Sequence, residues 1–286
     1  MFDGFKTEDI ATSGAQIRVR HGGSGPPLLL LHGNPQTSAM WRHLAPALAQ
    51  RHTVVCPDLR GYGFSSKPPA GDNHINYSKR AMARDMVEVM AALGHDRFGL
   101  CGHDRGGRVA HRLAYDHAGR VERLCVLDIA PTREMYANTD DAFARAYWHW
   151  FFMLLPHPVP EDMIGADPER FWEAQCSRGP GLSIFDGALD EYLAAFKNPE
   201  MIRASCDDYR AAANIDIEHD DAETGKLAMP LLCLWGADGV IERCFDPLAL
   251  WRLRADDVTG HALPCGHFMA EEAPGEIIRE LSAFFG

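Results

Sequence analysis

Short apolar runs alternate with longer segments of helical periodicity along the first 133 residues. The apolar runs have the length of a strand and are continuous, which is typical of strands buried on both faces of a sheet. Between them, apolar residues recur at the spacing of an amphipathic helix. The predicted strands are 28–31, 53–56, 98–101 and 124–127, and the predicted helices cover about 40–51, 78–93 and 106–116. This order predicts βαβ units and therefore a parallel sheet.

The same alternation returns near the C-terminus. It predicts strands at 231–235 and 258–263 and helices at 247–254 and 274–285. Together the two ends of the chain predict an α/β fold with a mostly parallel central sheet that is flanked by helices.

The residues between 134 and 226 lack a convincing buried strand. They carry the aromatic stretch YWHWFF at 147–152, a helical pattern at 168–176 and the acidic stretch IDIEHDDAE at 215–223. We therefore predict a core formed by residues 1–133 and 227–286, with residues 134–226 inserted as a helical cap on the sheet. No internal repeat and no low-complexity linker divides the chain further.

Composition narrows the class of protein. The chain has 286 residues, of which 46% are hydrophobic and 24% charged, as is ordinary for a soluble globular protein. Its formal net charge of −12 argues against nucleic acid and anionic membranes as partners, because no broad basic surface is present. An anionic substrate would therefore need a local positive site.

The sequence also shows no sign of export or of metal binding. Its first residues, MFDGFKTEDIATSG, have neither a basic start nor an apolar run, and its longest apolar runs are too short to span a membrane. Eight cysteines occur without a CxxC spacing, so we expect reduced thiols instead of disulfides or a zinc site. We expect a cytoplasmic protein that uses no metal and no organic cofactor.

The stretch CGHDRGGR at 101–108 holds the first candidate for catalysis. It places Asp104 between Gly102 and Gly106, where a strand is expected to turn sharply into a helix. With serine in the middle, G-x-S-x-G is the nucleophile elbow, and its glycines avoid collisions in the turn. Aspartate in that position can instead displace a leaving group at an sp³ carbon and form an alkyl ester. The simpler interpretation is an aspartate that caps a helix.

Hydrolysis of such an ester requires a base and an oxyanion hole. His267 in CGHFMAEE follows the last predicted strand, which is where the histidine of folds with this elbow is found. The predicted oxyanion donors are the backbone N–H groups of Asn34, in HGNP after an early strand, and of Arg105. We interpret His32 of the same motif as a structural histidine.

Two aspartates are candidates to orient the histidine. Asp128 ends the strand in LCVLDIAPT, and Asp238 follows the strand in LLCLWGADG. Both lie at the carboxyl edge of the predicted sheet, where open α/β folds place their sites. Either carboxylate could hold the tautomer of the histidine and support an imidazolium, so the strand pattern leaves both open.

These motifs together resemble the α/β-hydrolase superfamily and, within it, the haloacetate dehalogenases, especially the fluoroacetate dehalogenases. The resemblance implies hydrolysis of haloacetates to glycolate and halide through an ester on Asp104, and it suggests a homodimer. It covers most of the chain, in the stretches HGNPQTSAMW (32–41), PDLRGYGFSS (57–66), GHDRGGRVAHRLAYDH (102–117), LDIAPT (127–132), YWHWFF (147–152), SCDDYRA (205–211), ERCFDPLALWR (242–252) and LPCGHFMAEE (263–272).

The resemblance also implies roles for individual residues. Asp104 would be the nucleophile, His267 the base and Asp128 its acid partner. Arg105 and Arg108 would bind the carboxylate of a small anionic substrate. From a helix start at 105 these two arginines share a face beside Asp104, and a guanidinium can grip a carboxylate with paired hydrogen bonds.

A second group implied by the resemblance surrounds the leaving halide. His149, Trp150 and Tyr209 would replace the water shell of the halide as its charge develops. Trp172 in ERFWEA is a further candidate for the pocket wall. Asn34 departs from the aromatic residue that fluoroacetate dehalogenases usually have there and resembles the haloalkane dehalogenases, so chloroacetate or bromoacetate could serve as well as fluoroacetate.

Other functions share parts of this pattern. A haloalkane dehalogenase or an epoxide hydrolase would use the same aspartate elbow, but neither has a clear need for Arg105 and Arg108. An epoxide hydrolase would need two cap tyrosines, of which Tyr209 is one. A receptor without turnover belongs to a different class, and it need not keep a nucleophile, an acid and a base together.

Overall fold

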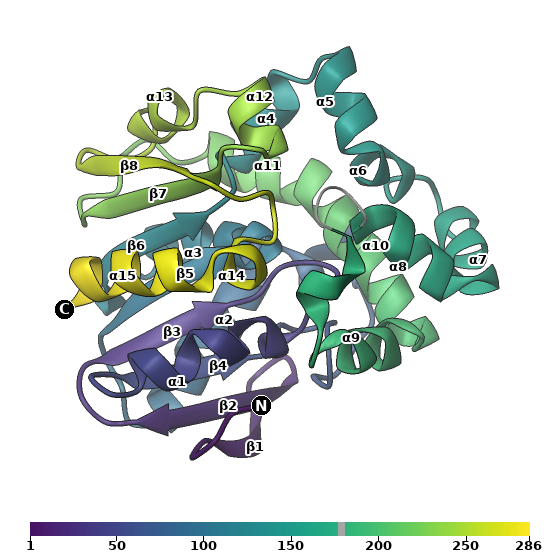
Figure 1. Ribbon diagram of the computed structural model, residues 1–286. Helices are drawn as coiled ribbons and strands as arrows, with labels where there is room; N and C mark the ends of the chain where they lie inside the picture. Colours follow the sequence, from purple (N-terminus) through teal and green to yellow (C-terminus); the bar gives the residue numbers. More distant parts are fainter. Residues whose placement is uncertain (177–180) are drawn as a thin grey trace.

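The computed structural model describes residues 1–176 and 181–286, and this part of the chain forms an eight-stranded sheet (Figure 1). The strand order is β1-β2-β4-β3-β5-β6-β7-β8. Strands β3 to β8 run parallel to one another, while β1 and β2 are antiparallel additions at one edge. The strands are β1 Lys6–Ala11, β2 Gln16–Gly23, β3 Pro27–Leu31, β4 Thr53–Pro57, β5 Phe98–His103, β6 Val121–Leu127, β7 Leu231–Gly236 and β8 Val258–Leu263.

The six predicted strands and the parallel sheet are confirmed, whereas β1 and β2 escape the pattern. The predicted strands are found because β3 to β7 are buried along most of their length, which requires continuous apolar runs. Strand β1, with the sequence KTEDIA, buries only Ile10, and β2 alternates buried and more exposed residues. Edge strands of this kind carry charges and have no apolar run to reveal them.

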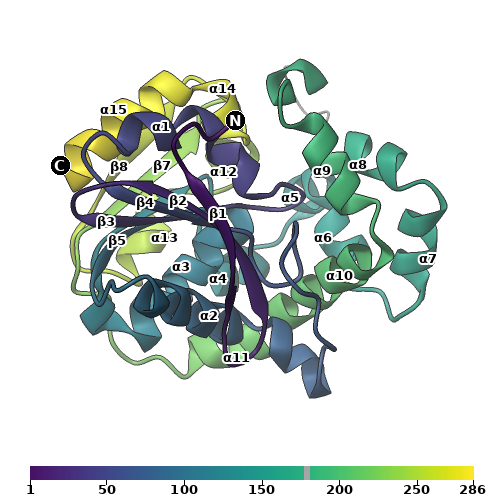
Figure 2. The ribbon, with the colours of Figure 1, turned by 90° about the horizontal axis from the view of Figure 1, so that it is seen from below.

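Helices cover both faces of the sheet (Figure 2). On one face lie α1 (Ala45–Leu48) and α15 (Pro274–Phe285), and on the other lie α2 (Lys79–Ala92) and α3 (Asp104–Asp116). The single helix predicted over 40–51 is wrong. The chain instead forms a 3₁₀ helix at Ser38–His43 followed by α1, because Pro46 has no backbone N–H and is tolerated only where a helix begins.

Between β6 and β7 the described residues form helices and no strand. Helices α5 to α10 gather beyond the carboxyl ends of the strands, whereas α4 and α11 pack beside the sheet layer (Figures 1 and 2). Their bounds are α4 Thr132–Ala137, α5 Asp141–Ala146, α6 Trp148–Phe152, α7 Val159–Ala166, α8 Pro168–Cys176, α9 Leu189–Phe196, α10 Pro199–Ala213 and α11 Ile215–Asp221. We call α5 to α10 the cap helices.

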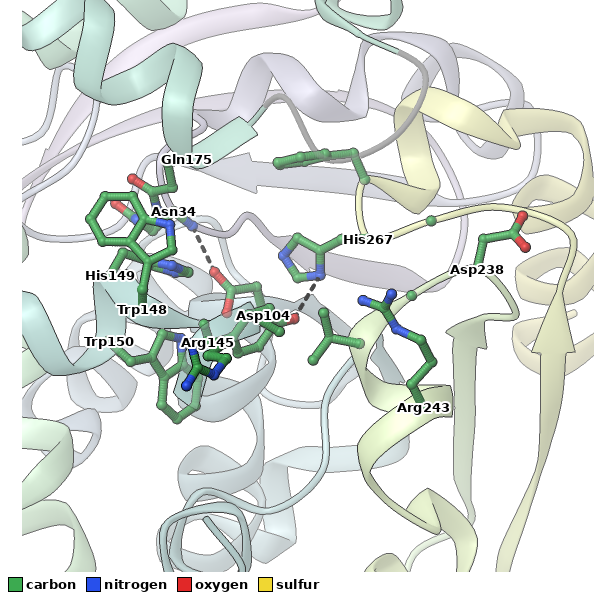
Figure 3. A pocket seen from close by; sticks show the side chains of 16 residues that line it. Asn34, Asp104, Arg145, Trp148, His149, Trp150, Gln175, Asp238, Arg243 and His267 are labelled. Atoms are coloured by element: carbon green, nitrogen blue, oxygen red, sulfur yellow. Dashed lines mark hydrogen bonds between the residues drawn. The ribbon is translucent and has the colours of Figure 1, made fainter. Parts of the chain in front are cut away.

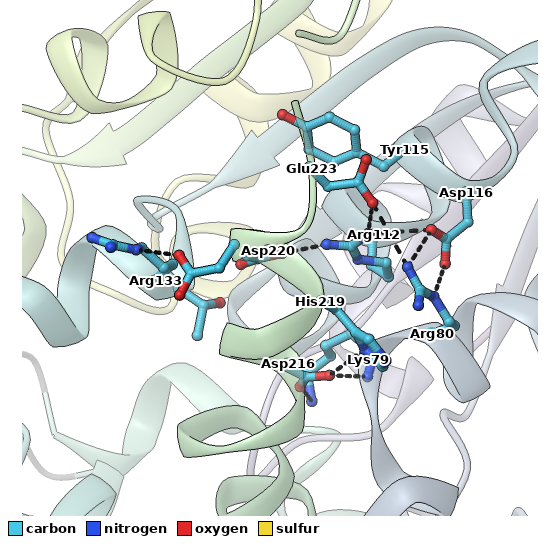
Figure 4. A network of polar contacts seen from close by, with 12 residues as sticks. Lys79, Arg80, Arg112, Tyr115, Asp116, Arg133, Asp216, His219, Asp220 and Glu223 are labelled. Atoms are coloured by element: carbon cyan, nitrogen blue, oxygen red, sulfur yellow. Dashed lines mark hydrogen bonds and ion pairs between the residues drawn. The ribbon is translucent and has the colours of Figure 1, made fainter. Parts of the chain in front are cut away.

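A buried charge network ties α11 to the core (Figure 4). Arg112 of α3 donates to Asp220 at 2.5 Å and to Glu223 at 2.7 Å, although its own side chain is only 3% exposed. Asp116 of α3 accepts in turn from Arg80 of α2 at 2.8 Å. A buried guanidinium is stable only when its donors are paired, so these contacts fix where the chain returns from the cap helices to the sheet.

The remaining α-helices follow the last two strands. They are α12 Val240–Cys244 and α13 Pro247–Arg252 after β7, and α14 Met269–Glu272 after β8. Within residues 1–176 and 181–286, no helix combines the length and the apolar character that crossing a membrane would require.

Candidate active site

The turn between β5 and α3 presents Asp104 at the carboxyl edge of the sheet. Asp104 is the first residue of α3 and has a φ of +44°, in the left-handed region that side chains other than glycine seldom adopt. A Cβ on Gly102 would lie 2.5 Å from the carbonyl oxygen of Gly106, and a Cβ on Gly106 would lie 2.4 Å from that of Leu31. The G-x-D-x-G pattern therefore has a packing reason, and the strand–turn–helix context that it predicts is present.

The Asp104 carboxylate lines a cavity of about 470 Å³ (Figure 3). Its Oδ2 accepts a hydrogen bond of 3.0 Å from the backbone N–H of Asn34. Burial by itself would raise the pKa of Asp104, but the charges of His267 and Arg108 outweigh burial, so the pKa lies below its ordinary value. The carboxylate is therefore ionised at neutral pH.

His267 lies in the loop between β8 and α14 and lines the same cavity, beside Asp104 (Figure 3). Its Nδ1 is 2.6 Å from Oδ2 of Asp128. Asp128 follows β6, has a φ of +50°, and accepts the backbone N–H of Gly236 on its other oxygen at 3.0 Å. The other candidate, Asp238, also lines the cavity, but it is exposed and its carboxylate points away from His267 in Figure 3. The structure thus brings Asp128, and not Asp238, to the histidine.

Arg105 is fully buried next to Asp104 in the chain. Its Nε donates to Oδ2 of Asp208 at 2.7 Å, and its Nη2 donates to the Asp208 carbonyl at 2.9 Å. The guanidinium lies 4.2 Å from the ring centre of Tyr209. Because Asp208 occupies two of its nitrogens, the paired grip on a carboxylate that the sequence suggests is not open to Arg105. Its Nη1 has no hydrogen-bond partner within the described chain.

Arg108 is arranged in a similar way on the next turn of α3. Its Nη1 donates to Oγ1 of Thr132 at 2.9 Å, and its Nη2 lies 3.3 Å from the sulfur of Met135. The guanidinium lies 4.5 Å from the ring centre of Trp150. Its Nε is buried and lacks a partner among the residues that the structure describes. Each arginine therefore has one buried nitrogen without a partner within the described chain, although neither arginine belongs to the described residues that line the cavity.

The residues predicted to surround the halide lie on two cap helices. His149 and Trp150 of α6 line the cavity. Tyr209 of α10 stands behind this wall, with its ring centre 6.0 Å from that of His149, and its hydroxyl accepts a 3.3 Å hydrogen bond from Nδ2 of Asn34. Burial raises the pKa of Tyr209 well above its ordinary value, so the phenol keeps a proton that it can donate.

The prediction that Trp172 lines the pocket is wrong. Trp172 does not belong to the described residues that border the cavity, and it is fully buried. Its indole N–H donates to the carbonyl of Pro35 at 3.2 Å. Trp172 therefore packs the HGNP loop against helix α8 from behind. The sequence pattern could not distinguish a tryptophan that supports the wall from one that forms it.

Several residues of the site were not predicted. The hydroxyl of Tyr147 lies 3.5 Å from Nδ1 of His267, and Gln175 and Arg243 also line the cavity. Asp208, which holds Arg105, is a further one. Tyr147 and Asp208 lie inside the stretches YWHWFF and SCDDYRA, so a signal was present, but their contacts depend on how the cap helices pack.

The chain belongs to the α/β hydrolase fold family, whose characteristic sequence it matches over residues 26–274. It is 46% identical to the fluoroacetate dehalogenase of Burkholderia sp., over 99% of this chain and 95% of that protein. It is 35% identical to the soluble epoxide hydrolase of Corynebacterium sp. (strain C12), over 96% of this chain and 94% of that protein. A crystal structure of a Nostoc sp PCC 7120 protein of this fold superposes with a TM-score of 0.97 at 52% identity, covering 100% of this chain and 99% of that one. The fold prediction is confirmed, while the names of these two relatives give two different activities.

Proposed function

We propose that this enzyme hydrolyses haloacetates, such as fluoroacetate and chloroacetate, to glycolate and halide. The observation that carries the proposal is the pair of buried arginines beside the ionised nucleophile. Nη1 of Arg105 and Nε of Arg108 are both buried and lack partners within the described residues. Two unsatisfied cationic donors are costly unless an anion fills the site, and a carboxylate can accept one hydrogen bond from each.

In the first step Asp104 is the nucleophile. Since the Asn34 N–H occupies Oδ2, Oδ1 attacks the carbon that bears the halogen. The carbon–oxygen bond of an ester forms, the carbon–halogen bond breaks, and the halide leaves with the bonding electron pair. The arginines offset the repulsion between the carboxylate of the substrate and that of Asp104.

In the second step His267 takes a proton from water, and the resulting hydroxide attacks Cγ of Asp104. Negative charge then develops on Oδ2, which already lies on the Asn34 N–H, and the N–H of Arg105 is the second proposed donor. The bond between Cγ and the ester oxygen breaks, and glycolate leaves with that oxygen, which takes the proton from His267. The proton of the added hydroxyl is then lost to solvent, so that Asp104 regains its carboxylate. Asp128, at 2.6 Å, stabilises the imidazolium that forms on His267.

The leaving halide is placed against His149, Trp150 and Tyr209 in this proposal. Because Asn34 donates to the hydroxyl oxygen of Tyr209, the phenol proton remains for the halide. Fluoride needs such donors most, since it is the most strongly hydrated halide. Asn34 is smaller than an aromatic residue, which leaves room for chloride or bromide as well.

Epoxide hydrolysis is the second candidate, supported by the 35% identical relative. It would use the same ester chemistry, with two phenols to protonate the ring oxygen. Tyr147 supplies a second phenol that lines the cavity, which the sequence did not reveal. Its hydroxyl is 3.5 Å from the histidine, whereas that of Tyr209 is bonded to Asn34. A haloalkane dehalogenase would leave the two arginine N–H groups without a ligand.

The deciding experiment compares the purified enzyme on fluoroacetate, chloroacetate, 1-chlorobutane and styrene oxide. We expect halide from the acids and little product from the two neutral compounds, because only an acid satisfies both arginines. Product from a neutral compound, with none from either acid, would refute the carboxylate role of Arg105 and Arg108. We also propose that the protein is a cytoplasmic homodimer. Size-exclusion chromatography with light scattering tests its oligomeric state.

A further inference from the structure

The backbone on both sides of His267 is held by one carboxylate. Oε2 of Glu272 accepts the N–H of Gly266 at 2.6 Å, and Oε1 accepts the N–H of Phe268 at 2.9 Å. Glu272 thus bonds the residue before the histidine and the residue after it. The carboxylate lies close against the loop, since a Cβ on Gly266 would lie only 3.0 Å from Oε2 of Glu272.

His103 holds the same peptide from the other side. Its Nε2 lies 2.8 Å from the carbonyl oxygen of His267, and the two rings are 4.7 Å apart. Burial lowers the pKa of His103 to about 4, so its ring is neutral at neutral pH and donates from Nε2 to that carbonyl. His103 immediately precedes Asp104, so this hydrogen bond joins the strand of the nucleophile to the loop of the base.

The turn that carries Glu272 is anchored separately. The neighbouring Glu271 accepts from Tyr192 of α9 at 2.6 Å and from Gln36 at 3.1 Å, and it forms a buried ion pair with Arg42. These contacts fix α14 to the core and to the cap helices without using the Glu272 side chain. A change at Glu272 therefore acts on the His267 loop while α14 keeps its anchor.

We infer that Glu272, with His103 opposite, is a positioning residue that sets His267 for hydrolysis of the ester on Asp104. A base works only within hydrogen-bond reach of its water, and a displacement of 1 Å can cost about 100-fold in rate. Formation of the ester needs Asp104 and the substrate but no proton transfer by His267. Loss of the Glu272 contacts should therefore slow the second step and spare the first.

The inference rests on the ester mechanism of the proposed function, and the test separates the two steps. In Glu272→Gln one amide oxygen cannot replace two carboxylate oxygens, so one of the two backbone N–H groups loses its acceptor. Rapid-quench experiments with chloroacetate should show an unchanged burst of chloride. Decay of the ester, followed by intact-protein mass as loss of a carboxymethyl group from Asp104, should slow by about 10- to 100-fold.

Two further variants serve as controls. Glu272→Asp retains a carboxylate and should recover most of the decay rate. Glu276→Gln removes a charge from a partly exposed glutamate on α15, which pairs with Arg279, and should match the wild type. Ester decay at the wild-type rate in Glu272→Gln would overturn the inference. An equal loss in the burst and in the decay would overturn it too, because a merely structural role slows both steps. If the wild type releases no halide, the proposed function fails, and the same decay is measured with styrene oxide.

Discussion

Asp104 and Asp128 reach the site from turns that directly follow β5 and β6, whereas His149 and Tyr209 reach it from the cap helices α6 and α10. Both aspartates have a positive φ, of +44° and +50°, and both accept a backbone N–H on one oxygen. The rings of His149 and Tyr209 pack against each other, and the hydroxyl of Tyr209 accepts a hydrogen bond from Asn34.

This difference indicates that the sheet edge and the cap helices contribute differently to the reaction. At the carboxyl edge of the sheet, the turns and their backbone hydrogen bonds hold the two carboxylates in defined positions. Bond breaking and bond formation require such exact placement. In the cap, packing shapes a cavity, and small changes in side-chain size alter what fits. The core half should therefore determine whether any ester is hydrolysed, and the cap half which leaving group is preferred.

The largest effect is expected at Asp128. Asp128→Asn should lower turnover by about 10⁴-fold on every substrate, because an amide stabilises neither the tautomer nor the charge of His267. Asp238→Asn is the matched control and should stay within about two-fold, as its side chain is exposed and points away. Halide release under steady state measures both. A larger loss at Asp238 would reverse the assignment of the acid.

An effect on substrate binding is expected at Arg108, which lies between the sheet edge and the cap helices. Arg108→Met should raise KM for chloroacetate by about 10- to 100-fold, since one charged hydrogen bond to the carboxylate is lost. The surface variant Arg84→Gln should leave KM unchanged. Equal KM values for wild type and Arg108→Met, in a folded protein, would show that the carboxylate binds elsewhere.

A smaller effect, graded by halogen, is expected at Tyr209. Tyr209→Phe removes only the hydroxyl and should lower kcat for fluoroacetate by about 10-fold, with a weaker effect on bromoacetate. Tyr115→Phe, whose hydroxyl bonds backbone carbonyls away from the site, is the control. The measurement is the ratio of kcat for Tyr209→Phe to kcat for the wild type, determined for fluoroacetate and for bromoacetate. A ratio that does not change with the halogen would place the leaving group away from Tyr209.

The smallest effect concerns stability at the junction of the two halves. Burial raises the pKa of Glu271 from 4.5 to about 7, although Arg42 opposes the shift. The folded protein thus binds more protons than the unfolded chain between these pH values. The contribution of Glu271 to the free energy of unfolding is therefore fully present below about pH 4.5. It falls by about 3 kcal/mol as the pH rises through 7. Thermal melts of Glu271→Gln should show a flatter fall of Tm from pH 5 to 8; an unaltered slope would contradict the shift.

Much of the core could be read from local patterns, and its exceptions have physical causes. Buried strands such as β5 need continuous apolar runs, so they are visible, whereas the polar edge strands β1 and β2 are not. Pro46 divides a segment whose apolar periodicity alone predicts one helix. In the site, Asp104 stands out because its elbow constrains the flanking glycines, which are themselves a sequence signal.

The cap half was harder to predict because its contacts join residues far apart in the chain. Trp172 is a large aromatic residue of the kind that often lines a pocket, but it lies behind the HGNP loop. Arg105 has the position of a bidentate clamp, yet Asp208, 103 residues away, occupies two of its nitrogens. No local pattern records such a partner.

By itself the sequence determined the parallel sheet, the aspartate elbow and the histidine after the last strand, since each depends on residues that are neighbours in the chain. Only the tertiary structure decided between Asp128 and Asp238 and placed Glu272 across the loop of His267. It also left one nitrogen of each arginine without a partner among the residues that the structure describes. These features depend on distances between separate strands and helices. Side-chain hydrogen bonds form or fail within about an ångström, and that precision arises when the helices and the sheet pack together.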